Sequence, residues 1–167
     1  LVITDMLPTG AGTSVTELGR HSPVLAGLED VAVIDGSQHL PILRRVSTWE
    51  ADYDIRGVLC LGEVFVEAGG LVADMLGLHH PGLRATRVCR NKYLQRLFLR
   101  RWSPRSELVT SLASGSFAED FAAGPAVLKP VGRFASSGVQ EVADPEELAR
   151  CLNGYEPGEM LVLETKV

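Results

Sequence analysis

The chain has 167 residues, of which 46% are hydrophobic and 22% charged, and its formal net charge at pH 7 is −5. These proportions are typical of a folded globular protein, and they exclude intrinsic disorder, collagen and coiled-coil architectures. The negative charge argues against a nucleic-acid-binding protein that relies on a general positive field. No apolar run approaches the roughly 20 residues that a membrane-spanning helix needs.

Cysteine and lysine are both scarce. The three cysteines lie far apart and show no metal-ligand spacing, so we predict buried thiols, no metal site and a reducing, cytoplasmic setting; they are Cys60, Cys89 and Cys151. Of the 16 basic residues, only three are lysines: Lys92, Lys129 and Lys166.

The first half of the chain alternates short apolar runs with helical patterns. Strands are expected over residues 1–4, 31–35 and 58–61, and helices over residues 14–19, 40–46 and 64–76. This alternation predicts βαβ units and a parallel sheet that binds ligands at the carboxyl ends of its strands. Glu63 follows the third strand and is a candidate substrate-binding residue. The alternative is that Glu63 is a solvated loop acid.

The second half changes character. Residues 83–102 favour one long, basic helix that ends before Pro104, with its charges solvated or packed on an acidic surface. Strands are then expected over residues 107–110, 126–130, 139–142 and 160–167, and helices over residues 117–121 and 145–152. Asp144 is expected to cap the last helix, with Pro145 at its first position and Glu147 completing a capping box. This order predicts an α+β lobe.

Lys129 lies within the apolar strand 126–130, where a buried lysine is costly without an anionic partner. The alternative is a lysine on the solvent face of that strand.

The small-residue loop that follows, bounded by Gly132 and Gly138, could point backbone N–H groups at a phosphate. A plain flexible hairpin is the alternative there. The carbonyl and N–H groups of the last strand could form hydrogen bonds with the edge of an adenine ring. The alternative is that this strand is only the edge of a sheet.

Taken together and in this order, these features resemble the ATP-grasp superfamily. Residues 87–96 (RVCRNKYLQR) resemble that family's helix with an [DN]-K pair, and residues 126–142 (AVLKPVGRFASSGVQEV) resemble its phosphate-loop hairpin. Residues 162–167 (VLETKV) resemble its hinge strand. The resemblance implies an α/β fold with a Rossmann-like, parallel-sheet pre-ATP-grasp domain over residues 1–82. A linking helix over 83–106 and an α+β ATP-grasp small lobe over 107–167 would follow.

The resemblance also implies a nucleotide site. The expected phosphate-binding residues are Lys92, Lys129, Gly132, Ser136, Ser137 and Gly138. The expected adenine-binding residues are Glu164, through its carboxylate, and Val167, through its backbone. The sequence departs from the family pattern at Arg133 and Phe134 in the loop, and at Thr165 and Lys166 in the hinge.

The activity implied is that of an ATP-dependent carboxylate–amine ligase, which forms an amide or peptide bond through an acyl phosphate. The expected partners are ATP, Mg²⁺ and a small carboxylate and amine, and a homodimer is a further expectation. The family's Mg²⁺ ligands lie in a C-terminal lobe that this chain lacks, so we expect a fragment. Two alternatives remain open: a non-catalytic nucleotide-binding or regulatory domain, and a carboxylase-like or carbamoyl-phosphate-synthase-like subunit.

Overall fold

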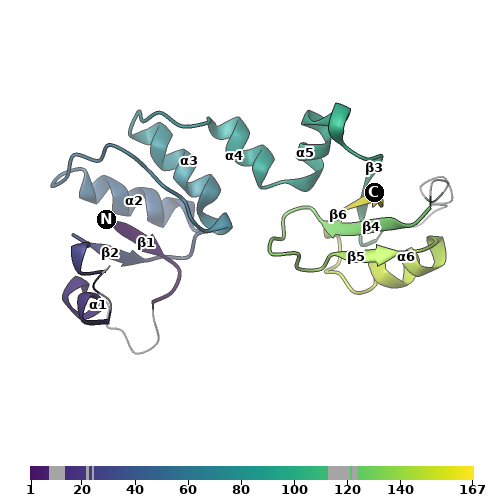
Figure 1. Cartoon of the computed structure of the whole chain (residues 1–167), viewed down its shortest axis with the longest axis horizontal. Helices are drawn as coiled ribbons and strands as arrows, with labels where there is room; N and C mark the ends of the chain where they lie inside the picture. The colour runs from purple at the N-terminus through teal and green to yellow at the C-terminus, as the bar shows by residue number, and fades with distance from the viewer. Residues whose placement is uncertain (8–13, 22, 24, 113–120, 122–123) are drawn as a thin grey trace. The chain divides into compact units, whose positions relative to one another are not determined.

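The computed structural model describes residues 1–7, 14–21, 23, 25–112, 121 and 124–167. The chain forms two compact units, Leu1–Thr86 and Arg87–Val167, which are both drawn in Figure 1. Each unit has its own sheet and its own buried core. Within the described ranges, no helix is both long enough and apolar enough to cross a bilayer.

The first unit is built on two parallel strands, β1 (Val2–Thr4) and β2 (Val31–Val33). Its helices are α1 (Val15–His21), α2 (His39–Trp49), α3 (Val66–Met75) and the start of α4 (Leu83–Cys89), with 3₁₀ turns at Leu25–Gly27 and Glu63–Phe65. Figure 1 shows α2 and α3 beside the two strands. The core forms where Ile42, Val46 and Trp49 of α2 pack against Ala68 and Val72 of α3.

The strand predicted over residues 58–61 is wrong, because this segment belongs to no strand and to no sheet in the described structure. The side chains of Leu59 and Leu61 are 83% and 90% exposed. Cys60 between them turns inward, with its Sγ 3.6 Å from the carbonyl oxygen of Phe65. The side chains of Val58 and Cys60 both lie beside Gly69 of α3, so the segment packs on that helix and forms no described strand pair with β1.

The second unit contains a four-stranded antiparallel sheet in the order β3-β6-β4-β5. Its elements are the end of α4, α5 (Lys92–Phe98), a 3₁₀ turn (Arg100–Trp102), β3 (Ser106–Thr110), β4 (Ala126–Pro130), β5 (Gln140–Val142), α6 (Pro145–Leu152) and β6 (Met160–Thr165). The helix predicted over 117–121 lies outside the described residues except at its last position.

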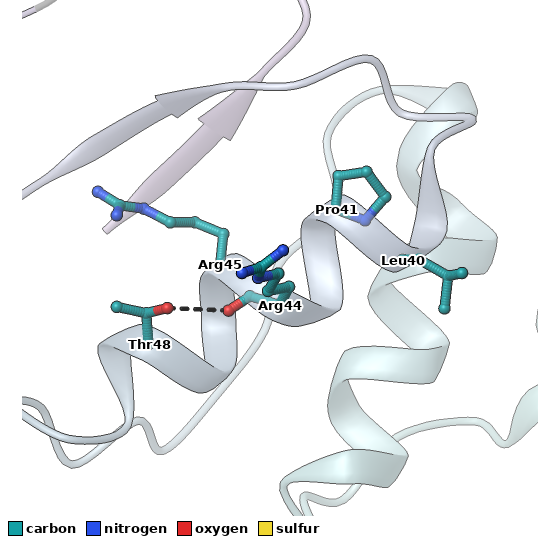
Figure 2. A pocket seen from close by; sticks show the side chains of 5 residues that line it. All are labelled: Leu40, Pro41, Arg44, Arg45 and Thr48. Atoms are coloured by element: carbon teal, nitrogen blue, oxygen red, sulfur yellow. Dashed lines mark hydrogen bonds between the residues drawn. The ribbon is translucent and has the colours of Figure 1, made fainter.

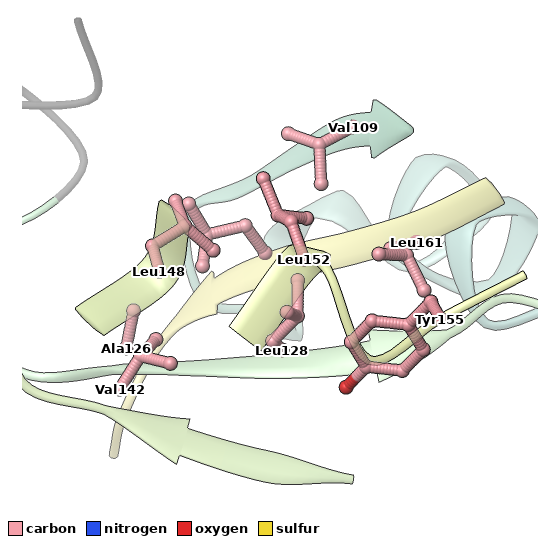
Figure 3. Close-up of a cluster of buried hydrophobic side chains, with 9 residues drawn as sticks. Val109, Ala126, Leu128, Val142, Leu148, Leu152, Tyr155 and Leu161 are labelled. Carbon is pink, nitrogen blue, oxygen red and sulfur yellow. The ribbon is translucent and has the colours of Figure 1, made fainter. Parts of the chain in front are cut away.

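One face of this sheet is covered by α6. Leu148 and Leu152 of α6 lie in a hydrophobic cluster with Leu128 of β4 and Leu161 of β6, as Figure 3 shows. Residues alternate between the two faces of a strand. The side chains next to Leu128 and Leu161 therefore point to the opposite face, away from α6.

The long helix predicted over residues 83–102 is wrong: the structure has two short helices and a 3₁₀ turn in its place. The break lies at Asn91, whose backbone is extended with φ −128° and ψ 107°. The Asn91 side chain accepts a hydrogen bond from the N–H of Leu94 at 2.9 Å, which caps α5. Asparagine is a preferred N-cap residue, so it begins a new helix here instead of continuing the old one.

Candidate functional site

Lys129 and Glu164 share the face of the second sheet that α6 does not cover. In the β4–β6 register Lys129 lies opposite Val162, and Val127 lies opposite Glu164. The two charged residues are therefore diagonal neighbours on adjacent strands, within reach of one another. Strand alternation thus places an ammonium and a carboxylate together on one face of the sheet.

Glu164 is buried, with a side chain only 5% exposed. Its Oε1 accepts a hydrogen bond from the ammonium of Lys129. Arg96 of α5 binds the same carboxylate with two donors, Nε at 2.7 Å from Oε2 and Nη2 at 3.3 Å from Oε1. A buried carboxylate needs such charged partners to offset its lost hydration. The three residues form one ion-pair cluster with an excess of positive charge.

Lys92, the first residue of α5, brings a third cation to this cluster. Its ammonium donates to the carbonyl oxygen of Arg133, and its backbone N–H donates to the carbonyl of Val131 at 3.2 Å. Burial lowers the pKa of Lys129, and the positive charges of Arg96 and Lys92 lower it further. Contact with the Glu164 carboxylate opposes this shift. Lys92 and Lys129 therefore lie close enough to interact.

A strained turn lies at the tip of the loop over residues 131–138. Ala135 and Ser136 have φ values of 51° and 58°, and the N–H of Ser137 donates to the carbonyl of Phe134 at 3.0 Å. Two positive φ values at the centre of such a turn define type I′, which normally takes Asn-Gly. Each L-residue in this conformation costs about 1–2 kcal/mol. The Ser137 N–H, a predicted phosphate donor, is engaged inside the turn.

The two glycines that bound this loop have different surroundings. Gly132 is exposed, and a Cβ added there would meet open space. Gly138 has φ 72°, and an added Cβ would lie 3.0 Å from Cγ of Pro130 and 3.1 Å from Nη1 of Arg133. Glycine is required at position 138 both for its backbone conformation and for this close approach.

Two predicted site residues remain, Val167 and Glu63. Val167 follows β6 and is fully exposed. Glu63 begins a 3₁₀ turn in the first unit, whereas the other predicted site residues lie in the second. Arg96 was missed by sequence reasoning. The signal that could have found it is its spacing, since it lies four residues after Lys92 and on the same side of a helix.

Two cavities are found in the first unit. A shallow one of about 440 Å³, shown in Figure 2, lies on α2 and is lined by Leu40, Pro41, Arg44, Arg45 and Thr48. A second one of about 660 Å³ lies between β1, α2, α3 and the segment 55–62, and its walls are mainly apolar. Neither cavity is lined by a predicted site residue among those the structure describes.

The cluster suits an anion and not a divalent metal ion. Mg²⁺ prefers carboxylate and water oxygens, whereas this cluster offers three cations and one carboxylate that is already paired. Nowhere in the described part of the chain do three or more His, Cys, Asp or Glu side chains gather to hold a metal ion. Closely spaced ammonium and guanidinium groups are instead the usual partners of phosphate groups.

The fold is similar to those of solved ligases. An L-amino acid ligase from Bacillus licheniformis superposes with a TM-score of 0.65 and 20% identity, covering 83% of this chain and 33% of that one. A D-alanine–D-alanine ligase from Bacillus anthracis, also solved in complex with ATP, gives 0.61 and 19% and covers 99% and 56%. Phosphoribosylglycinamide synthetase from Anaerococcus prevotii gives 0.57 and 14%, covering 99% and 44%.

These neighbours are ATP-grasp ligases, so the chain has an ATP-grasp-like fold of mixed α/β type, with one small parallel and one antiparallel sheet. The chain spans between a third and just over half of the length of these neighbours. No protein family and no curated protein matches the sequence. The relationship is therefore one of fold.

Proposed function

We propose that this chain supplies the nucleotide-binding part of an ATP-dependent carboxylate–amine ligase. The observation that carries the proposal is the convergence of Lys129, Arg96 and Lys92 beside the 131–138 loop, on a sheet of ATP-grasp-like fold. Lys129 and Arg96 share the single buried carboxylate of Glu164, which leaves an excess of positive charge in that cluster. A polyphosphate would offset that charge.

We assign the phosphates of ATP to Lys92 and Lys129, and we add Arg96 to this set. The loop glycines and serines at positions 132 and 136–138 would close over the phosphates with backbone N–H donors. Because the N–H of Ser137 donates to Phe134 in the free chain, the type I′ turn has to open before this donor can reach a ligand. The strain in that turn lowers the cost of opening it.

We also propose that Glu164 changes partners when the nucleotide binds. A carboxylate accepts about four hydrogen bonds, and Lys129 and Arg96 already supply three. The one acceptor site left, together with the site that Lys129 releases when its ammonium binds the phosphates, would be open to the adenine amino group. The backbone of Val167, which follows the same strand, would lie beside the adenine ring.

Bound ATP would supply the phosphoryl group that converts a carboxylate substrate into an acyl phosphate. An amine would then displace phosphate and form an amide. The side chains of this chain would act by neutralising phosphate charge and by fixing the position of the nucleotide, which are the main catalytic effects in phosphoryl transfer. The described residues do not fit a Mg²⁺ site, so we route no step through a metal held by them.

The ligase reaction is proposed for a protein that joins this chain to the remaining length of its structural neighbours. In that protein residues 1–82 would form a Rossmann-like pre-ATP-grasp domain, with Glu63 as a substrate contact. Residues 83–106 would link it to the small lobe over 107–167. A cytoplasmic location and a homodimer belong to the same proposal.

The test is ATP binding by this chain, measured by isothermal titration calorimetry. We expect Lys129→Met to weaken binding at least about tenfold, since a charge-assisted hydrogen bond contributes roughly 1.5–3 kcal/mol. Lys166→Met is the matched control, because the Lys166 ammonium pairs with Glu141 on the surface, 2.7 Å from its carboxylate. Unchanged affinity in Lys129→Met, or no ATP binding by the natural chain, contradicts the proposal.

The reaction is tested separately in the longer protein. We expect ADP and phosphate to form with at least one carboxylate of an amino-acid panel when an amine is present. ATP binding without any such turnover would favour the alternative of a non-catalytic nucleotide-binding domain.

A further inference from the structure

Arg133, one of the two loop residues that depart from the ATP-grasp pattern, is anchored at the edge of the proposed nucleotide site. Its guanidinium binds the carboxylate of Glu159 through two parallel hydrogen bonds, Nε to Oε1 at 2.7 Å and Nη2 to Oε2 at 2.6 Å. The same guanidinium lies over the ring of Tyr155, 5.8 Å from its centroid. A bidentate pair of this kind fixes the orientation of both planar groups.

Tyr155 connects this anchor to the other end of the loop. Its hydroxyl donates to the carbonyl of Gly138 at 2.6 Å and accepts a hydrogen bond from Nε2 of Gln140 at 3.0 Å. The Tyr155 side chain is buried, at 8% exposed. Arg133, Tyr155 and Glu159, which we call the clamp, therefore hold both ends of the loop against the segment between α6 and β6.

The clamp also acts on Lys92. The Lys92 ammonium donates to the backbone carbonyl of Arg133, so a shift of that carbonyl would move a hydrogen-bond acceptor of the ammonium. Fixing the Arg133 side chain at Glu159 fixes the backbone that bears the carbonyl. The clamp thus links Glu159, on the opposite side of the loop, to one of the cations assigned to the phosphates.

We propose that Arg133 and Glu159 are positioning residues that hold the Lys92 ammonium in the orientation in which it receives the phosphates of a nucleotide. This inference rests on the proposed function and names residues of the same site. Neither side chain needs to touch the nucleotide, because both act through the Arg133 carbonyl.

The test uses the sign of a charge change. Glu159→Gln removes a negative charge near a polyanion, so a purely electrostatic effect would tighten ATP binding. A loss of positioning would instead weaken it, and we expect the dissociation constant to rise about three- to tenfold. Arg133→Gln should weaken binding by a similar factor, and the double variant should lose no more than either single one. Glu156→Gln is the control, because it removes the same charge from an exposed position three residues earlier.

A second readout needs no nucleotide. The chain has only three lysines, so ¹³C labelling of lysine Cε gives three resolvable NMR signals. We expect Glu159→Gln to shift the Lys92 signal and to leave that of Lys166 in place. An unshifted Lys92 signal, or ATP binding that is unchanged or tighter in Glu159→Gln, overturns the inference. Absence of ATP binding by the natural chain overturns the proposed function instead, and the Lys92 signal still decides whether the clamp orients this side chain.

Discussion

Two opposing effects act on the pKa of Lys129. Burial and the charges of Arg96 and Lys92 lower its pKa, whereas the Glu164 carboxylate in contact with it favours the charged form. Because its pKa is lowered, Lys129 loses its proton at a lower pH in the folded chain than in the unfolded chain, where the pKa of lysine is about 10.4. Between these two values the unfolded state holds more protons, so Lys129 makes the free energy of unfolding rise with pH.

Removal of the Arg96 charge is therefore expected to raise the pKa of Lys129. Arg96→Gln removes the neighbouring positive charge and leaves the Glu164 carboxylate to pair with Lys129 alone. Both changes favour the charged ammonium and therefore raise the pKa of Lys129. The measurement is a pH titration of the Lys129 Cε signal by NMR, with Lys166 as the internal reference. An unchanged or lower pKa for Lys129 in the variant would show that Arg96 does not control its ionisation.

Among the elements, those with strong local signals were predicted well. The strand over 126–130 and the helix over 145–152 match β4 and α6 residue for residue. The N–H of Glu147 donates to the side chain of Asp144 at 2.8 Å, as the predicted cap requires. The Glu147 carboxylate, however, accepts from the N–H of Ala143, the residue before the cap, and not from that of Asp144, so the predicted capping box forms only in part. The long helix failed because the side-chain pattern of residues 83–102 does not reveal that Asn91 turns back to cap α5.

The Asn91 cap is expected to matter for the site as well as for stability. Asn91→Ala should cost about 0.5–2 kcal/mol of unfolding free energy, and it should also weaken ATP binding because α5 begins at Lys92 and carries Arg96. Asp144→Ala is the matched control, since it removes the equivalent cap from α6. Urea unfolding and calorimetric titration of both variants provide the check. Equal ATP affinities in the two variants would contradict a role for this cap in placing the cations.

At the scale of the whole molecule, the sequence assigned Lys92 and Lys129 to one nucleotide site, but it did not predict their contacts with the Arg133 carbonyl and with the Glu164 carboxylate. Arg96 and Glu164 are 68 residues apart, and Lys92 and Arg133 are 41 apart. These contacts depend on the packing of α5 against the sheet, which no local pattern encodes. The change from alternating strands and helices to an α+β order was easier to anticipate, because both patterns are local in the sequence, whereas the division at residues 82 and 106 stays a prediction.

Because each unit has its own core, a defect in the first should leave the second intact. The carboxylate of Asp30 accepts from the indole N–H of buried Trp49 at 2.8 Å and from Arg45 at 2.6 Å. Asp30→Ala leaves that N–H without its partner, at an expected cost of about 1–3 kcal/mol. Trp49 fluorescence in a Trp102→Phe background reports the first unit, and the Lys129 NMR signal reports the second. A simultaneous loss of both signals would show that the units unfold together.

The lowered pKa of Lys129 has one more consequence. A larger uncharged fraction makes an amine a better nucleophile at neutral pH, and an acyl phosphate formed nearby would be an electrophile able to acylate it. The contact with Glu164 favours the protonated nitrogen. If the chain has the proposed ligase function, the buried carboxylate would thereby protect Lys129 from acylation, in addition to its structural role.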